Sequence, residues 1–199
     1  RILQNEANRF GRKKYKVMVF FITARATGFY ADLFNRVARQ TGLDVLQIHS
    51  RMSQSARTKT SEKFRQSEHS ILFTSDVTAR GMDYPDVTAV VQVGLTEQAQ
   101  YIHRLGRTAR AGKDGHGILL LTPVEKKHMV KELNDMPLVA TEIPEFAIGT
   151  NSYMDQALAD VDGNYELKQS AEQAYRAWLG YYNGCSKKLG WSKEQLVQE

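Results

Sequence analysis

The sequence predicts an α/β protein in which a parallel sheet carries helices on both faces, followed by an all-helical C-terminal extension. Short, wholly apolar runs alternate with helical stretches over residues 1–140, which is the pattern of strands buried on both faces. The pattern changes afterwards, where Pro144 and Gly149 precede two stretches of helical periodicity. A chain of 199 residues is long enough for one such core and an appendage. We therefore expect a core over residues 1–140 and the extension over residues 141–199.

The core is expected to contain five strands, each a short apolar run rich in β-forming residues. They cover residues 17–22, 45–48, 70–74, 87–93 and 117–121. Ser53 is a suitable N-cap for a helix, and Pro123 suits the first helical position of another. Further helices are expected over residues 29–38 and 97–105.

The extension is expected to form helices over residues 151–159 and 165–182, with a short third helix after Ser192. Gly184 is the predicted end of the second helix. That helix repeats apolar residues at spacings of three and four, which predicts a packed stripe made of Leu167, Ala171, Ala174, Tyr175, Trp178 and Tyr182. Tyr181 lies off this stripe and is the better candidate for an exposed contact.

The charge of the chain is unevenly distributed. Residues 1–140 hold 22 Lys and Arg against 13 Asp and Glu, whereas residues 141–199 hold 5 against 9. A basic core favours polyanions such as nucleic acids, although basic surfaces can also serve solubility alone. Cys185 is the single cysteine, so we expect neither an internal disulfide nor a cysteine-based metal site, and no residue is a candidate metal ligand. No apolar run reaches the length of a membrane span, and the start at Arg1 suggests a fragment or processed product.

The most informative block is the basic stretch His103-Arg-Leu-Gly-Arg-Thr-Ala-Arg110. Its arginines recur every three residues, and such close cations repel one another unless an anion lies among them. A guanidinium is planar, always charged and able to bind a phosphate through two hydrogen bonds. An arginine side chain that is placed beside the transferred phosphate can also stabilise the charge that develops in phosphoryl transfer. The alternative interpretation is a solvated basic turn.

Two more polar segments could hold a ligand. Ser75 to Asp83 directly follows a predicted strand, and Gly81 would let the backbone approach a ligand closely. Gln54-Ser-Ala-Arg57 lies at a predicted helix N-terminus, where backbone amides favour anions. Ligands of parallel sheets bind beyond the carboxyl ends of the strands, and we expect three polar clusters to lie there, namely Thr23–Arg25, Ser75–Asp83 and His103–Arg110. Taken alone, the segment from Ser75 to Asp83 could equally be a simple turn, and the segment from Gln54 to Arg57 could equally be an ordinary helix start.

Taken together and in order, these blocks resemble the C-terminal RecA-like domain of DEAD-box RNA helicases. The resemblance covers roughly residues 15–140. Phe20-Phe-Ile-Thr23 resembles motif IV, Gln54 with Arg57 resembles the Gln-x-x-Arg element, Ser75 to Asp83 resembles motif V, and His103 to Arg110 resembles motif VI. Two small departures are Ser75, where threonine is usual, and Ala109, where glycine is common.

The resemblance implies a role for each of these positions. Arg107 and Arg110 would approach the γ-phosphate of ATP, with Arg107 as the arginine finger. Asp83, supported by Gly81, would contact the ribose of ATP. His103 would take part in contacts between the two helicase domains. The RNA backbone would be held by Thr23, Gln54, Arg57, Ser75 and Arg80.

The extension resembles that of the fungal mitochondrial intron-splicing DEAD-box helicases, which are general RNA chaperones. The matching segments are Ala174-Tyr-Arg-Ala-Trp-Leu-Gly-Tyr-Tyr182 and Lys187-Lys-Leu-Gly190. This part of the resemblance implies a location in the mitochondrial matrix, with the nucleolus or the cytoplasm as alternatives.

The sequence contains neither Gly-x-x-x-x-Gly-Lys-Ser/Thr nor Asp-Glu-Ala-Asp. We therefore expect ATP and Mg²⁺ to be held mainly by a separate N-terminal RecA-like domain, and this chain alone to lack ATPase activity. Its expected partners are that domain and RNA, duplex and single-stranded, without sequence preference. Two alternatives stay open, a stand-alone RNA-binding module with vestigial ATP motifs and a helicase half acting on DNA or chromatin.

Overall fold

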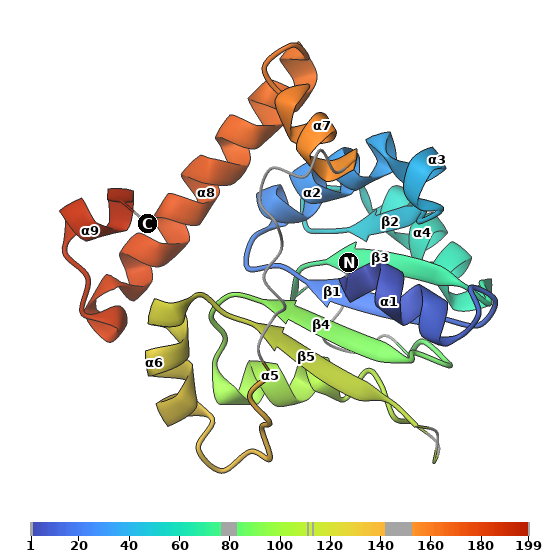
Figure 1. Cartoon of the computed structure of the whole chain (residues 1–199), viewed down its shortest axis with the longest axis horizontal. Coiled ribbons are helices and arrows are strands. Elements are labelled where there is room, and N and C mark those ends of the chain that lie inside the picture. Colours follow the sequence, from blue (N-terminus) through green and yellow to red (C-terminus); the bar gives the residue numbers. More distant parts are fainter. Residues whose placement is uncertain (1, 77–82, 111, 113, 142–152, 199) are drawn as a thin grey trace.

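The computed structural model describes residues 2–76, 83–110, 112, 114–141 and 153–198, and it confirms the predicted parallel core (Figure 1). One sheet of five strands has the order β2-β3-β1-β4-β5, and every neighbouring pair is parallel. The strands are β1 (Lys16–Phe20), β2 (Val45–Ile48), β3 (Ser70–Thr74), β4 (Ala89–Val93) and β5 (His116–Leu120). Each lies within two residues of its predicted bounds, and β1 and β3, which are buried throughout, match the unbroken burial that the sequence predicted.

The helices of the core begin where capping side chains allow. They are α1 (Ile2–Arg9), α2 (Ala24–Arg36), α3 (Ala38–Thr41), α4 (Gln54–Gln66), α5 (Gln98–Leu105) and α6 (Pro123–Glu132). Thr23 and the predicted Ser53 each accept a backbone N–H at the start of their helix, and Thr122 forms a capping box with Glu125. The sequence did not predict α1, and α2 begins five residues earlier than expected.

Alternate residues of the strands build an apolar layer on each face of the sheet. Val17, Val19 and Phe73 belong to the layer that packs against α1 and α2. Met18, Phe20 and Leu72 face the opposite way, where Phe64 of α4 covers them. The core therefore lies in two layers, and the ends of the strands stay accessible to polar loops.

The extension forms α7 (Tyr153–Ala159), α8 (Tyr165–Leu189) and α9 (Lys193–Gln198). The predicted stop at Gly184 is wrong, because α8 continues through it to Gly190, which takes the left-handed conformation with φ 69°. Cys185 and Leu189, beyond the predicted stop, pack into the apolar cluster shared with α6, and this packing explains why the helix continues. The predicted boundary near residue 140 adjoins residues 142–152, which lie outside the described residues.

Two tyrosines of α8 depart from the predicted stripe. Tyr175 was assigned to the packed stripe, yet its side chain is 52% exposed. Tyr181 was expected to be exposed, yet it is half-buried, and its hydroxyl donates to the Leu95 carbonyl at 3.2 Å. Burial raises the pKa of Tyr181 to about 12. Helical spacing gave the correct stripe for Leu167, Ala174 and Tyr182, which are buried, but it did not foresee the second contact made through Tyr181.

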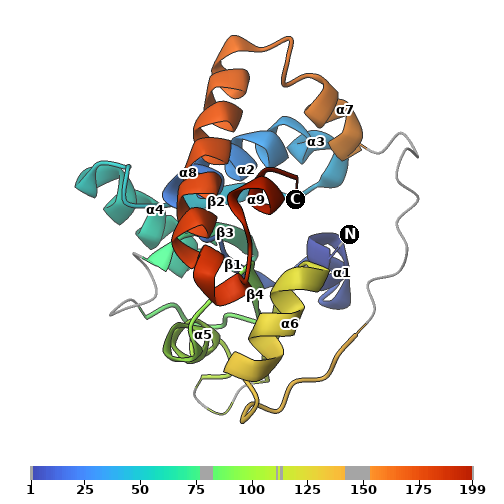
Figure 2. The ribbon, with the colours of Figure 1, turned by 90° about the vertical axis from the view of Figure 1, so that its left-hand side faces the viewer.

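The extension packs on the core at two places. Leu33 and Val37 of the core cluster with Ala157 and Leu167 of the extension. Further along α8, the Tyr182 hydroxyl donates to the buried Glu125 carboxylate. Figure 2 shows α8 running beside α2 and continuing towards α6. Across the described part of the chain, no helix is both long and apolar enough to cross a membrane.

Candidate nucleic-acid interface

Three parallel strands, β1, β2 and β3, end at one edge of the sheet, and each is followed by a polar loop. Thr23 lies after β1, Arg51 lies after β2, and Ser75 directly follows β3. Thr23 Oγ1 accepts the Ala26 N–H at 3.1 Å, and Ser53 Oγ accepts the Ala56 N–H at 3.2 Å. The N-termini of α2 and α4 therefore also lie at this edge, where their free amides and dipoles favour an anion.

We refer to this region as the carboxyl-edge surface, made of Thr23, Arg25, Arg51, Gln54, Arg57 and Ser75. Four of the five residues expected to hold RNA belong to it, and the fifth, Arg80, lies outside the described residues. Gln54 is exposed, whereas Ser75 is 8% exposed and reaches the surface over a small area. The structure thus brings together residues that are 52 positions apart in the chain.

The carboxyl-edge surface contains three arginines, Arg25, Arg51 and Arg57. Across the described residues, no carboxylate forms an ion pair with Arg25, Arg51 or Arg57. Arg57 Nε is buried and has no hydrogen-bond partner in this part of the structure. Burial, and then the nearby Arg51, lower the pKa of Arg25. Guanidinium groups near helix N-termini are chemically suited to phosphate.

The expectation that all the polar segments meet at this edge is wrong for Asp83 and for the block from His103 to Arg110. Helix α5 begins after the carboxyl end of β4 and carries the chain back, because a parallel β5 must start at the opposite edge. Arg107 and Arg110 therefore lie near Val87 and Thr88, just before β4. His103 is exposed near the end of α5. We call Arg107 and Arg110 the amino-edge arginine pair.

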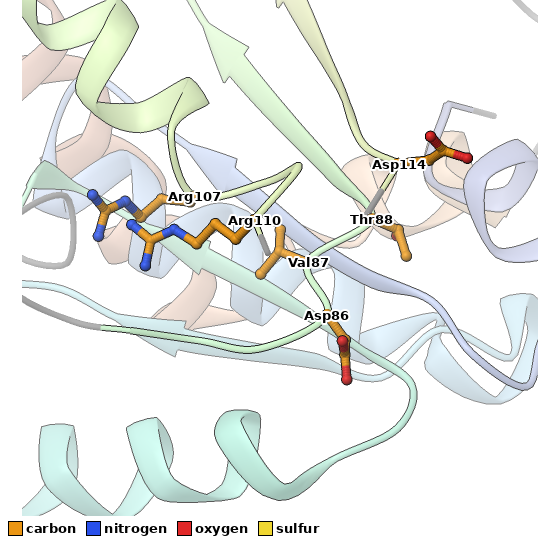
Figure 3. Close-up of a pocket in the computed structure, with 6 residues that line it drawn as sticks. All are labelled: Asp86, Val87, Thr88, Arg107, Arg110 and Asp114. Atoms are coloured by element: carbon orange, nitrogen blue, oxygen red, sulfur yellow. The ribbon is translucent and has the colours of Figure 1, made fainter. Parts of the chain in front are cut away.

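The amino-edge arginine pair lines a small open pocket of about 90 Å³, whose other walls are Asp86, Val87, Thr88 and Asp114 (Figure 3). The two guanidinium groups point the same way in Figure 3. Thr108, between the two arginines, is buried and donates to the Val87 carbonyl at 2.5 Å, which fixes the turn against the start of β4. Nucleotide pockets are usually several times larger, so this pair could meet one side of a triphosphate but not enclose it.

Each arginine of the pair is held by neighbouring groups. Arg107 Nε donates to the His103 carbonyl at 3.2 Å, and Arg110 Nε donates to the Gly106 carbonyl at 2.7 Å. Arg110 also forms an ion pair with Asp83, whose side chain is 79% exposed. Burial lowers the pKa of Arg107, Arg110 lowers it further, and Asp83 opposes them. Gly81, the other residue expected at the ribose, lies outside the described residues.

Arg104 does not join these arginines around an anion, contrary to the expectation for the basic block. Its side chain is 2% exposed, and its Nε and Nη2 donate to Asp76 Oδ1 at 2.8 and 2.6 Å. Gln100 donates to the other carboxylate oxygen of Asp76 at 3.1 Å. Arg104 also lies over the Phe20 ring, 5.4 Å from its centroid. Asp76 follows Ser75, and Arg104 lies on α5, which precedes Arg107. The ion pair between Asp76 and Arg104 therefore links the carboxyl-edge surface to the amino-edge arginine pair.

The described residues contain no group of three or more His, Cys, Asp or Glu side chains that could hold a metal ion. The linking pair of Asp76 and Arg104 was not predicted, because no periodicity connects residues 28 positions apart on two different elements. An acidic residue two positions after a buried strand was the available signal.

Comparison with known protein families gives one clear match. Residues 2–112 match the family described as the Helicase conserved C-terminal domain. Curated relatives include DEAD-box ATP-dependent RNA helicase 31 of Arabidopsis thaliana, 47% identical over 94% of this chain, and DEAD-box ATP-dependent RNA helicase 31 of Oryza sativa subsp. japonica, 47% identical over 92%. The chain covers 25% and 32% of these relatives, so it spans about a quarter to a third of their length.

Solved structures give the same picture of the fold. Mss116p DEAD-box helicase domain 2 bound to an RNA duplex is similar with a TM-score of 0.76 and 28% identity, over 98% of this chain and 75% of that one. DEAD-box helicase Mss116 bound to ssRNA and UDP-BeF is similar with a TM-score of 0.78 and 28% identity, over 98% of this chain and 38% of that one. Both similarities cover the extension as well as the core, and they confirm the predicted RecA-like fold.

Proposed function

This chain belongs to the helicase conserved C-terminal domains of the DEAD-box RNA helicases, and from that premise we propose that its own activity is to bind the RNA backbone at the carboxyl-edge surface. The observation that carries this proposal is a set of three arginines beside two helix N-termini, none of which forms an ion pair with a carboxylate among the described residues. Contacts to phosphates and sugars carry no base information, so binding is largely independent of sequence.

The RNA form that fits best is the A-form duplex, with single strands as a second substrate. One similar structure is named as bound to an RNA duplex and another as bound to single-stranded RNA. Recognition of a duplex by its backbone uses the shape of the A-form helix and the 2′-hydroxyl groups. Hydroxyl and guanidinium groups such as those of Thr23 and Arg57 can make such contacts.

The amino-edge arginine pair serves ATP that is held by a separate N-terminal RecA-like domain. In phosphoryl transfer, ATP with Mg²⁺ develops charge on its terminal phosphate oxygens, which arginine side chains can stabilise. In this proposal Arg107 is the arginine finger, Arg110 supports it, and Asp83 accepts hydrogen bonds from the ribose. Asp83 must then give up part of its ion pair with Arg110. His103 contributes to the contact between the two domains.

The parent protein is, in this proposal, an ATP-dependent RNA chaperone of the intron-splicing kind, located in the mitochondrial matrix. The similarity to Mss116 along both core and extension supports this finer grouping. The curated relatives named above are plant helicases, so the compartment rests on the extension alone. Fractionation of cells that express the tagged full-length protein tests it, and a nucleolar or cytoplasmic signal contradicts it.

The RNA-binding proposal is tested by fluorescence anisotropy with a labelled RNA duplex and a DNA duplex of the same sequence. We expect tighter binding to the RNA duplex, with an affinity that falls steeply between about 50 and about 200 mM salt. Equal affinity for the DNA duplex, or an affinity that does not change with salt, contradicts the proposal. Either result would favour a helicase half that acts on DNA, or a surface without a nucleic-acid role.

The division of labour between two domains is tested by a phosphate-release assay on this chain with ATP, Mg²⁺ and RNA. We expect no release above the protein-free control, because the phosphate cradle is missing from the sequence. Release that disappears on Arg107→Ala would show that the chain holds a complete ATP site. Addition of the separate N-terminal domain should restore release only with wild-type Arg107.

A further inference from the structure

We propose that Tyr181 and Tyr182 of the extension are positioning residues for the arginine finger, because they hold the segment that leads into α5. We call these two residues the tyrosine pair. Helix α5 ends just before Arg107, so a shift at the start of this helix is carried to the guanidinium that serves ATP. This inference rests on the proposed function, because it gives the extension a part in the work of Arg107.

The start of α5 is not fixed by a capping side chain of its own. Other helices of the chain start at a side chain that accepts a backbone N–H, namely Thr23, Ser53, Thr122 and Asn164. Among the described residues, Glu97 at the N-cap of α5 accepts no such bond, and the first turn of α5 holds no acidic residue. A helix start without a cap leaves its position to contacts from other elements.

The tyrosine pair supplies such contacts to the turn that leads into α5. The Tyr181 hydroxyl donates to the Leu95 carbonyl at 3.2 Å, two residues before Glu97. The Tyr182 hydroxyl lies against the same turn, because a Cβ atom added to Gly94 would come within 3.0 Å of it. Gly94 has φ 84°, a conformation that favours glycine and leaves room for this approach. The extension therefore fixes the backbone of residues 94 and 95.

Burial keeps the Tyr181 hydroxyl in its protonated form. It raises the pKa of Tyr181 to about 12, and Arg104 lowers this pKa whereas Asp76 raises it. At neutral pH the hydroxyl therefore remains a donor to the Leu95 carbonyl. The influence of both charges also places Tyr181 within electrostatic reach of the ion pair that links the two edges of the sheet.

Apolar packing and one ion pair also join α8 to α5. Tyr101 of α5 is buried in the apolar cluster that contains the tyrosine pair, and Leu105 packs partly against this cluster. These two α5 residues are four positions apart and lie on one face of the helix. Lys188 Nζ lies 3.3 Å from Glu97 Oε1, but both side chains are exposed, so this pair contributes little. The half-buried hydrogen bond from Tyr181 is therefore the stronger polar connection.

The far end of α5 carries the position of the helix to Arg107. The Arg107 N–H donates to the Arg104 carbonyl at 3.1 Å, and the Thr108 N–H donates to the Leu105 carbonyl at 3.1 Å. The Arg107 side chain is held to the same turn, because its Nε donates to the His103 carbonyl at 3.2 Å. A catalytic group misplaced by about 1 Å can cost roughly 100-fold in rate, so a shift of roughly 0.3–0.5 Å should cost roughly 3–10-fold.

The test is RNA-stimulated ATP hydrolysis by the full-length protein that carries Tyr181→Phe, a change that removes only the hydroxyl. We expect kcat to fall roughly 3–10-fold, with the KM for ATP and the affinity for duplex RNA changed by less than about twofold. In the proposed function both ligands are bound at other surfaces, and an arginine finger acts mainly in the transition state. Tyr182→Phe should lower kcat in the same direction.

Two variants separate positioning from a loss of stability. Leu167→Val loosens the other end of α8, where Leu167 is buried against α2, and should lower the melting temperature without changing kcat well below that temperature. Tyr175→Phe makes the same chemical change as Tyr181→Phe at an exposed side chain and should alter neither quantity. Equal losses of kcat in Leu167→Val and Tyr181→Phe would make the extension a structural brace alone and would overturn the positioning role.

Arg107→Ala distinguishes this inference from the proposed function. If Arg107→Ala abolishes turnover while Tyr181→Phe leaves kcat unchanged, the positioning role is overturned and the arginine finger stands. If Arg107→Ala leaves turnover unchanged, the proposed role of Arg107 fails, and the role of the tyrosine pair fails with it.

A second readout uses this chain alone and does not depend on catalysis. The Nε–Hε resonance of Arg107 in an NMR spectrum reports the surroundings of its guanidinium. This resonance should shift in Tyr181→Phe and should keep its wild-type position in Leu167→Val and Tyr175→Phe. A wild-type position in Tyr181→Phe as well would show that loss of the hydroxyl does not reach Arg107, and it would overturn the inference.

Discussion

Arginine side chains lie at both edges of the sheet, but their contacts differ. At the carboxyl edge, Arg25, Arg51 and Arg57 form no ion pair with any described carboxylate. At the amino edge, Arg110 pairs with Asp83, and Arg107 donates to the backbone. The first edge is therefore ready to bind a polyanion as it stands. The second edge holds its arginines in internal contacts, which a ligand must replace.

The link between the edges is an ion pair whose arginine is buried. Arg104 is fully buried and joins Asp76, at the carboxyl edge, to the helix that precedes the amino-edge arginine pair. A buried guanidinium tolerates few alternative positions, because each one must supply a counter-charge. The differences between the edges, and this link, lead to four predictions.

The largest expected effect contrasts one arginine from each edge. Arg57→Gln should weaken the binding of duplex RNA by roughly 10-fold or more, because a charge-assisted hydrogen bond contributes about 1.5–3 kcal/mol. Arg107→Gln removes the same charge from the other edge and should change the affinity by less than about twofold. Fluorescence anisotropy measures both. Equal losses for the two variants would mean that the edges do not differ in the way described.

The second prediction concerns the link. Asp76→Asn leaves the buried Arg104 without its counter-charge and should lower the free energy of unfolding by about 2–3 kcal/mol, less than for a fully buried pair because the Asp76 side chain is 45% exposed. For a chain of this size, that corresponds to a melting temperature lower by roughly 4–12 °C. Thermal denaturation followed by circular dichroism measures the change.

A matched control for the link is Asp44→Asn, which removes an exposed ion pair to Lys63, 3.8 Å long, with side chains 78% and 64% exposed. It should change the free energy of unfolding by less than about 0.5 kcal/mol. If Asp76→Asn were as mild as Asp44→Asn, the link would have no structural importance.

The third prediction tests whether the extension supports the carboxyl ends of the strands. Tyr182→Phe removes the hydrogen bond to Glu125, which is 2% exposed, and should lower the free energy of unfolding by about 1–2 kcal/mol. Tyr175→Phe makes the same chemical change at a side chain that is 52% exposed and should have almost no effect. Urea denaturation compares the two, and equal midpoints would contradict a docked extension.

The smallest expected effect is a pH dependence centred on His49. Its pKa in the folded chain lies below the ordinary value of about 6.5, so the unfolded chain binds the proton first on acidification. The free energy of unfolding should therefore fall as the pH drops below about 6.5. Burial, and then Arg51 and Arg25, oppose the imidazolium, and a bound phosphate would offset the two arginines. RNA affinity should then rise by roughly two- to threefold between about pH 7.5 and about pH 5.5.

His49→Gln is the control for this pH dependence, because it removes the titrating group and keeps a polar side chain of similar reach. Its RNA affinity should vary less with pH than that of the wild type, as measured by anisotropy in buffers of constant ionic strength. An unchanged pH profile would show that another group titrates.

The sequence could predict the sheet well because strands buried on both faces are mostly apolar, as in the central residues 71–73. It could not place Arg107 and Arg110. The rule that ligands bind beyond the carboxyl ends of parallel strands says nothing about the residues at the end of a crossover helix such as α5, which lie towards the opposite edge. It also missed α1, whose mixed sequence from Ile2 to Arg9 carries few apolar residues and is helical by virtue of packing on the sheet. Long-range pairs such as Asp76 with Arg104 require the tertiary structure.

The most direct measurement is a map of duplex RNA on the chain by NMR, with the backbone amides of the 22.6-kDa protein followed during titration. We expect the largest shifts at Thr23, Arg25, Arg51, Arg57 and Ser75, and little change at Arg107 and Arg110. This result would show that the carboxyl-edge surface alone binds RNA. Largest shifts at the amino-edge arginine pair, with none around Arg57, would contradict the division of the molecule into an RNA edge and an ATP edge.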